Sequence, residues 1–320
     1  KERSGRRERH YSHHAHLVSK AINARNRGAK AVILVNGDIE DSGELVKFGS
    51  VAGPDDASIL MVQVTNAVAE KWFAAAGKPL SELQKSIDGN GRPQSFVFPD
   101  SFKISLGVEI ERKQATVHNV IGYLPGETDE YIIIGAHHDH LGPGFPGADD
   151  DASGVAAVRE AARILYARRA DLRRPVVIAF FGAEEWGLRG SAWCSRHLPP
   201  GVQRIVAALT LDTVGRRGVN AVSVVGKTIY PALGEVAARC LDAEGFDRGR
   251  EIDRFAFAWG SDHYALHAAG IHAVDLFSSD YGVMHTPEDT PDHIDPEKLT
   301  RLARAAAAFA LDLSRKGLPR

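Results

Sequence analysis

The stretch "YIIIGAHHDH", Tyr131–His140, places a turn rich in histidine and aspartate directly after an apolar run suited to a buried strand. Similar runs recur along the chain as "PVVIAFFGAEE" at 175–185, "IVAALTLD" at 205–212, "AVSVVG" at 221–226 and "HAVDLFS" at 272–278. Stretches with apolar residues three or four apart separate several of them, at 152–169, 230–245 and 296–316. This alternation predicts an α/β fold whose mostly parallel mixed sheet is covered by helices on both faces.

The hydrophobic pattern divides the chain near residue 100. Before it, residues 16–37 predict a helix, a glycine break and a buried strand, and residues 59–77 predict a strand followed by a helix. The polar connector "IDGNGRPQS", 87–95, comes next, and residues 102–111 and 115–125 then alternate as two long strands would. We expect two domains, 1–98 and 99–320.

Composition excludes several functional classes. The 320 residues carry a formal net charge of −2, which gives no electrostatic reason to expect a nucleic-acid partner. Cys194 and Cys240 are the only cysteines, so neither a disulfide framework nor a thiolate metal cage is available. No apolar run approaches the roughly 18 residues that a membrane span requires.

Acidic and histidine-bearing motifs follow the predicted strands, where the loops of such sheets converge on a crevice. One of them, "GADDDASG" at 147–154, stacks three carboxylates at the start of a predicted helix. A single carboxylate would suffice to cap the helix, whereas three adjacent ones repel one another and favour a cation. Together, His, Asp, Glu, Asp and His from five loops can surround two divalent ions with oxygen and imidazole donors.

Five motifs carry a family resemblance in one order along the chain: "GAHHDHLG", "GADDDASG", "AEEWGLRGS", "LTLD" and "VMHTPEDT". They resemble the two-zinc aminopeptidase family that includes secreted bacterial leucyl aminopeptidases, over about residues 115–315. The resemblance implies the zinc exopeptidase type of fold. The earlier "KAINARNRGAKAVILVNGD", 20–38, resembles the middle of a small α+β protease-associated domain, incomplete at its start.

The resemblance also implies a ligand set for two Zn²⁺ ions. Asp150, the middle acid of the triplet, would bridge them. His137 and Asp212 would complete one site, and Glu185 and His285 would complete the other.

Further roles follow from the same family pattern. Glu184 would be the general base, and Asp139 would orient the first histidine ligand by accepting its other ring proton. Asp149 and Asp151 would support the turn, and the peptide bond between Asp150 and Asp151 would be cis.

The implied activity is hydrolysis of peptides that have a free amino terminus, in a periplasmic or extracellular location. Two alternatives within the same fold are a zinc carboxypeptidase and a glutaminyl cyclase-like enzyme. A receptor-like protein that has lost its ligands and only binds partners is a further alternative, which the intact ligand set disfavours.

Other histidines compete for the metal role. His138 is the neighbour with which the ligand His137 could be confused. His263 and His267 stand four apart on a predicted helix but lack the glutamate of a His-Glu-x-x-His motif, so we interpret them as structural. The cluster "HYSHHAH", 10–16, is interpreted as a solvated segment.

Overall fold

A computed structural model describes residues 17–35, 45, 57–111, 114–198, 200–250, 260–279 and 281–318. Contacts divide the chain into two compact units, Lys1–Gln114 and Ala115–Arg320. This division falls later in the chain than the boundary predicted between residues 98 and 99. The histidine-rich segment 10–16 lies outside the described residues.

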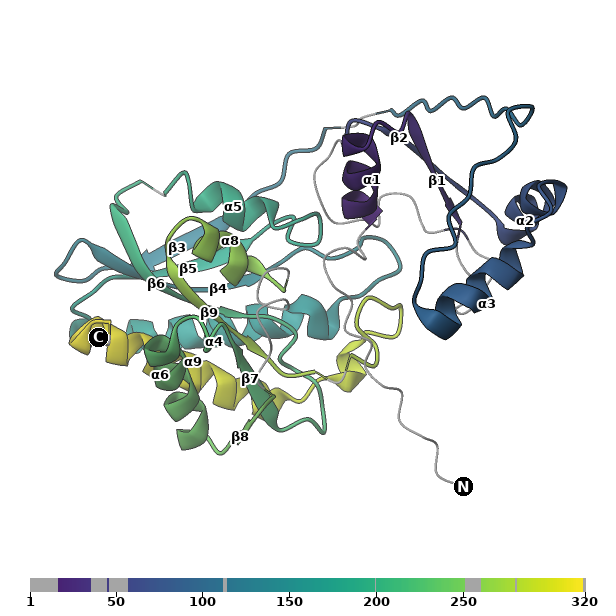
Figure 1. Ribbon diagram of the computed structural model, residues 1–320. Coiled ribbons are helices and arrows are strands. Elements are labelled where there is room, and N and C mark those ends of the chain that lie inside the picture. Colours follow the sequence, from purple (N-terminus) through teal and green to yellow (C-terminus); the bar gives the residue numbers. More distant parts are fainter. Residues whose placement is uncertain are drawn as a thin grey trace, which may run out of the picture. The chain divides into compact units, whose positions relative to one another are not determined.

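The described residues of the first unit form three helices and a two-stranded parallel sheet (Figure 1). Its described elements are α1 (Leu17–Asn26), β1 (Ala31–Val35), β2 (Leu60–Val64), α2 (Asn66–Ala75) and α3 (Leu80–Asn90). Gly28, with φ of 86°, adopts the left-handed conformation that turns the chain from α1 toward β1. Helix α3 includes the start of the predicted connector, which is a correction. The protease-associated assignment stays a prediction.

The predicted strand at 102–111 is wrong, because the structure has no regular element over these residues. The sequence alternates there, but a strand also needs a hydrogen-bonding neighbour, and among the described residues this segment is in no sheet. The second predicted strand is shorter than expected and forms β3 (Val120–Leu124), which pairs antiparallel with β5 (Val176–Phe181).

The second unit has a seven-stranded mixed sheet in the order β3-β5-β4-β6-β9-β7-β8. Its central strands β5, β4, β6 and β9 run parallel, while β3 and β7 each pair antiparallel with a neighbour. Its remaining elements are β4 (Glu130–His137), η3 (Ala148–Ser153), α4 (Gly154–Ala167), η4 (Arg169–Asp171), α5 (Arg189–Cys194), β6 (Arg204–Leu211), β7 (Ala221–Val225), α6 (Pro231–Ala243), β8 (Asp247–Arg248), α8 (Asp262–Ala268), β9 (His272–Phe277), η5 (Pro291–His293) and α9 (Pro296–Lys316).

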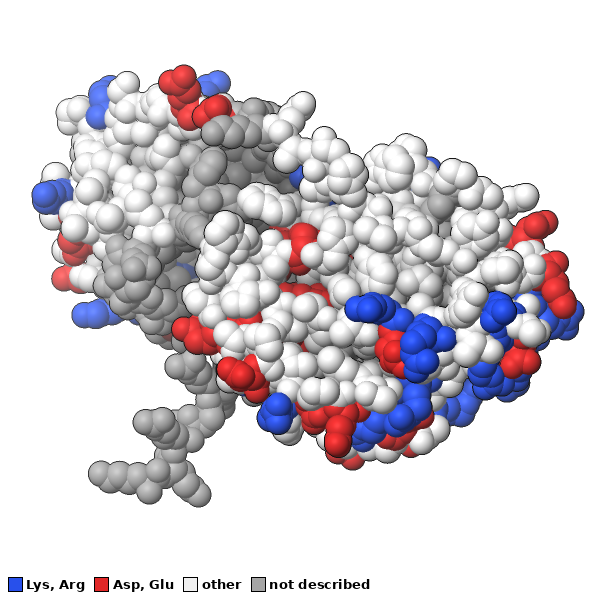
Figure 2. Space-filling model, turned by 180° about the vertical axis from the view of Figure 1, so that it is seen from behind, with Lys and Arg blue, Asp and Glu red and all other residues white. Residues whose placement is uncertain are grey.

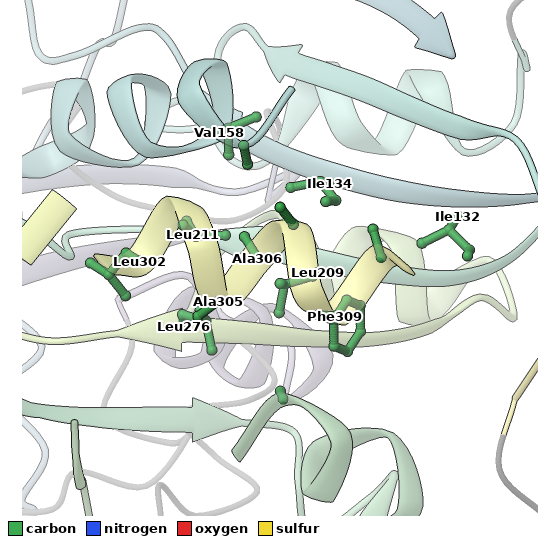
Figure 3. Close-up of a cluster of buried hydrophobic side chains, with 14 of the residues drawn as sticks. Ile132, Ile134, Val158, Leu209, Leu211, Leu276, Leu302, Ala305, Ala306 and Phe309 are labelled. Atoms are coloured by element: carbon green, nitrogen blue, oxygen red, sulfur yellow. The ribbon is translucent and has the colours of Figure 1, made fainter. Parts of the chain in front are cut away.

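Strand β4 is central because both of its faces are apolar. Ile132 and Ile134 point to the core that α4, α6 and α9 cover, whereas Ile133 packs in a second core with residues of α5 and α8. Figure 3 shows the first core, where strand side chains such as Leu209 meet Phe309 of α9. Fully burying a side chain of this kind stabilises the fold by about 1.5–3 kcal/mol.

The α/β fold predicted from the sequence, with a mostly parallel mixed sheet and helices on both faces, is therefore confirmed. On the face seen in Figure 2, basic and acidic side chains lie interspersed, in keeping with the small net charge. Within the described residues, no helix combines the length and the apolar character that crossing a membrane requires.

Candidate metal centre

The predicted site residues follow the carboxyl ends of neighbouring strands. His137 ends β4, Glu184 and Glu185 follow β5, and Asp212 follows β6. His285 lies on the loop between β9 and η5. Because β4, β5 and β6 are adjacent and parallel, these residues meet at one edge of the sheet.

The backbone is strained at three positions of this edge. Ala183, Thr213 and His285 have φ values of 54°, 53° and 60°, in the left-handed region that non-glycine residues rarely adopt. Ala183 directly precedes Glu184, and Thr213 directly follows Asp212. Such conformations cost of order 1–3 kcal/mol each, so the surrounding structure holds these turns in place.

The acidic triplet forms the turn η3, and its three carboxylates differ in surroundings. The Asp149 carboxylate accepts a hydrogen bond from the Gly215 amide at 2.6 Å. The Asp151 carboxylate accepts from the amides of Gly154, Thr213 and His137 at 2.9, 3.2 and 3.2 Å. These hydrogen bonds fit the supporting roles predicted for Asp149 and Asp151.

Asp150, between them, points toward histidines instead. Its backbone is fixed by Asp289, whose carboxylate accepts hydrogen bonds from the amides of Asp149 and Asp150 at 2.9 and 3.1 Å. The peptide bond between Asp150 and Asp151 is cis, as the family resemblance implied.

The first group of candidate ligands consists of His137, Asp150 and Asp212, and all three are buried. His137 Nε2 lies 3.1 Å from Asp150 Oδ1 and 3.8 Å from Asp212 Oδ1. Burial lowers the pKa of His137, but the contacts with the two aspartates raise it well above its usual value. Burial raises the pKa of Asp212, but the contact with His137 lowers it to about 2.

The second group is built around Glu185 and shares Asp150 with the first. His285 Nε2 lies 2.9 Å from Asp150 Oδ2 and 3.2 Å from Glu185 Oε2. His140 Nδ1 lies 2.7 Å from Glu185 Oε1 on the other side. Burial raises the pKa of Glu185, yet the two histidines lower it to about 2, and the carboxylates of Asp150 and Glu185 raise that of His285 to about 10.

Several atoms that converge in these groups make no hydrogen bond. Among the described residues, the buried atoms without a hydrogen-bond partner include His137 Nε2, Asp150 Oδ2 and Glu185 Oε1. Buried polar atoms are costly when they lack partners, and clustered carboxylates repel one another. Two sets of three have one candidate ligand atom per residue within 4.8 Å of the others and so fit a metal ion: His137, Asp150 and Asp212, and His140, Asp150 and Glu185.

Glu184 lies beside these groups and is held by its backbone. Its amide donates a hydrogen bond to Asp139 Oδ1 at 2.9 Å. Burial raises the pKa of the Glu184 carboxyl well above its usual range, although the charge of His137 opposes the shift. A carboxyl with a raised pKa is suited to accept and then donate a proton.

The expected role of the Asp139 carboxylate is corrected by this hydrogen bond. His137 Nδ1 lies 3.1 Å from the backbone carbonyl oxygen of Asp139, whereas the nearer carboxylate oxygen is 3.8 Å away. Asp139 therefore orients His137 through its main chain, because its carboxylate is turned toward the Glu184 amide. Because Nδ1 of His137 faces this carbonyl oxygen, Nε2 is the ring nitrogen that faces the metal group.

Among the described residues, the competing histidines His138, His263 and His267 belong to neither group. His138 is exposed and its Nε2 lies 2.9 Å from the His118 carbonyl oxygen, so His137 is the residue that faces the carboxylates. His267 Nδ1 lies 2.6 Å from the hydroxyl oxygen of Tyr230, and His263 is buried within α8.

Sequence reasoning missed His140 and Asp289. His140 stands in the quoted motif "HHDH" and Asp289 in "HTPEDT", so both were visible as members of motifs without a role. Their positions relative to Glu185 and the acidic triplet depend on how two distant loops fold back, which the spacing of residues does not specify.

Known proteins are similar to this chain in sequence and in fold. The sequence profile of peptidase family M28 matches residues 119–310. Leucine aminopeptidase 1 of Pyrenophora tritici-repentis is 27% identical over 61% of this chain and 55% of its own length. Aminopeptidase YwaD of Bacillus subtilis is 28% identical over 63% of this chain and 46% of its own length. The chain thus spans about half the length of these curated relatives.

Solved structures show the same relationship. The aminopeptidase from Aneurinibacillus sp. strain AM-1 matches 93% of this chain and 66% of its own, with a TM-score of 0.62 and 26% identity. A zinc aminopeptidase from Bacillus subtilis matches 62% of this chain and 50% of its own, with a TM-score of 0.51 and 27% identity.

Proposed function

Because this chain belongs to peptidase family M28, we propose that it is a zinc-dependent aminopeptidase that removes amino-terminal residues from peptides. The observation that carries the proposal is the pair of ligand groups that share Asp150, with Glu184 beside them. The names of its relatives, leucine aminopeptidase and zinc aminopeptidase, support both the metal and the reaction.

We assign two zinc ions to the two groups. His137, Asp150 and Asp212 would hold one ion, and Asp150, Glu185 and His285 would hold the other. The donors are imidazole nitrogens and carboxylate oxygens, which zinc accepts readily. Asp150 suits the bridging role because its Oδ1 faces His137 and its Oδ2 faces His285.

When bound, zinc ions supply Lewis-acid polarisation of the scissile carbonyl and lower the pKa of a water molecule. The Glu184 carboxylate then accepts the proton of the attacking water and transfers it to the nitrogen of the leaving amine. Asp139 fixes the turn that bears Glu184 and, through its carbonyl oxygen, the ring of His137. The two glutamates therefore have separate tasks, proton transfer for Glu184 and metal binding for Glu185.

The aminopeptidase reaction is tested with matched peptides that have free or acetyl-capped amino termini. Chelation should abolish cleavage of the free peptide and added zinc should restore it, while the capped peptide should resist cleavage. Equal rates on both peptides would contradict the aminopeptidase assignment, and full activity of the metal-free protein would contradict the metal mechanism. Formation of pyroglutamate from an amino-terminal glutamine without chain cleavage would favour the cyclase alternative.

A further inference from the structure

We infer that His140 is an additional protein ligand of the second metal group, through its Nδ1. This inference rests on the proposed function and extends its ligand set beyond Asp150, Glu185 and His285. His140 lies three residues after His137, the last residue of β4, and the two histidines face different groups. His137 joins Asp150 and Asp212, whereas His140 joins Asp150 and Glu185.

The side chain of His140 is built into the site. It is only 10% exposed, and neither of its ring nitrogens has a hydrogen-bond partner. Its Nδ1 nevertheless lies 2.7 Å from Glu185 Oε1, which also has no hydrogen-bond partner. Ligand atoms of these two residues also lie within 4.8 Å of a carboxylate oxygen of Asp150, so a shared cation would satisfy all three.

Gly147 provides the space that this arrangement requires. Its φ is 64°, and a Cβ atom built on it would lie 2.7 Å from His140 Cγ and 2.7 Å from the Asp150 carbonyl oxygen. Any side chain at this position would therefore displace the imidazole ring or the Asp150 backbone. The glycine that opens the acidic triplet thus seats the His140 ring against the second group.

With His140, the second group has four protein donors, whereas the first group has three. Zinc sites with four protein ligands are typical of tightly held metals, and catalytic sites usually keep an open position. We therefore expect the second group to retain its metal longer than the first during chelation.

The direct test uses the metal alone and no substrate. The full chain, labelled with ¹⁵N-histidine, is loaded with two equivalents of ¹¹³Cd²⁺, and one-bond couplings between cadmium and imidazole nitrogens are recorded. We expect couplings from His137, His140 and His285, and the His140→Ala variant should lose one of them. The exposed neighbour His138 is the matched control, and His138→Ala should keep all three. Two bound cadmium ions coupled only to His137 and His285 would overturn the inference.

Zinc affinity separates a ligand from a residue that only positions Glu185. The His140→Asn side chain is able to donate a hydrogen bond to the Glu185 carboxylate and so hold it in place, but it is a poor zinc ligand. In competition with a chelator, we expect both His140→Ala and His140→Asn to weaken the second zinc by about 10²-fold or more, at or above the usual effect of losing a group that only supports a ligand. Parental affinity in His140→Asn would overturn the ligand role.

Failure of this inference is distinguishable from failure of the proposed function. A parent chain that binds no zinc or cadmium would refute the metal-dependent peptidase itself. A parent that binds two ions and cleaves free peptides, but shows no coupling to His140, would refute only the present assignment.

Discussion

At the scale of single residues, the clearest distinction lies between Glu184 and Glu185. We predict that Glu184→Gln keeps both metals while kcat falls about 10²–10⁴-fold, the usual range for losing a general base. Glu185→Gln should bind one zinc more weakly, because it loses a charged donor that contacts His285, and added zinc should recover part of its activity.

Metal content and steady-state kinetics on both variants decide this prediction. If Glu184→Gln lost zinc while Glu185→Gln retained it with a collapsed kcat, the two roles would be exchanged. The substitutions are matched, because each replaces one carboxylate by an amide of nearly the same size.

The residues at the site were largely predictable from the sequence, but their orientations were not. The family resemblance of the motifs implied His137, Asp150 and Glu185 as ligands, and the structure brings these residues into the two groups at the carboxyl end of the sheet. His140 was overlooked because a motif does not state toward which group a ring in a tight turn will face. The Asp139 carboxylate was misassigned for the same reason. The sequence does not show whether the carbonyl or the carboxylate of Asp139 accepts the hydrogen bond from His137.

At the scale of elements, the buried carboxylate of Asp151 joins three segments: the end of β4, the start of α4 and the loop after β6. It does so by accepting hydrogen bonds from three amides, those of His137, Gly154 and Thr213. An unsatisfied buried donor costs about 1–3 kcal/mol. We predict that Asp151→Ala lowers the free energy of unfolding of the zinc-loaded protein by about 3 kcal/mol or more.

Urea unfolding measures this loss, and two further variants sharpen it. Asp151→Asn should lower stability less than Asp151→Ala does. Its side-chain oxygen can still accept hydrogen bonds from the Gly154 and Thr213 amides, and only the His137 N–H then faces another N–H group instead of an acceptor. Asp171→Ala removes a surface carboxylate that pairs with Arg168 and Arg315, so it should lower stability far less than Asp151→Ala does. If Asp151→Ala lowered the free energy of unfolding no more than Asp171→Ala does, the Asp151 carboxylate would not stabilise the contact between the three segments.

The elements themselves show what a pattern can and cannot specify. Strand β4 was predictable because apolar residues on both faces fit a strand covered by helices on both sides. Residues 102–111 have the alternation of a strand, but pairing depends on a partner elsewhere in the chain, and local alternation does not identify one. Helix α3 extends past the point predicted for a connector, since Gly89 and Asn90 are accommodated in its last turn.

At the scale of the whole molecule, the site gathers many buried carboxylates, whose negative charge must be balanced by protons, histidines or metal ions. Burial raises the pKa of Asp262 to about 7, and that of Asp275 well above its usual value. The pKa of His285 is raised to about 10 by neighbouring carboxylates. Without metal, the folded protein therefore binds protons more tightly than the unfolded chain between about pH 5 and pH 8.

Stability must fall with rising pH wherever the folded state holds more protons. We predict that the metal-free protein unfolds at a lower temperature at pH 8 than at pH 5. The stability contributed by a protonated His285 is complete below pH 6.5 and is lost as the pH rises through about 10. The protonated Asp262 loses its contribution as the pH rises from about 4 through about 7.

Thermal unfolding in a chelator, with and without an excess of zinc, tests this prediction. Zinc should raise the unfolding temperature most at pH 8, because a bound cation replaces the missing protons and stabilises the folded state by mass action. A metal-free protein that is more stable at pH 8 than at pH 5 would show that these groups do not dominate the balance.

The order in which the residues are synthesised also fixes when each metal group can be complete. Strand β4 lies between β5 and β6, which are both made after it, and the last assigned ligand, His285, is made later than all the strands. Helix α9, which covers the core beneath them, is made after His285. A chain still being translated therefore lacks a complete second group until the ribosome is close to the end of the residues described here. The second group can therefore be completed only after the first, whose members His137, Asp150 and Asp212 all precede His285 in the chain.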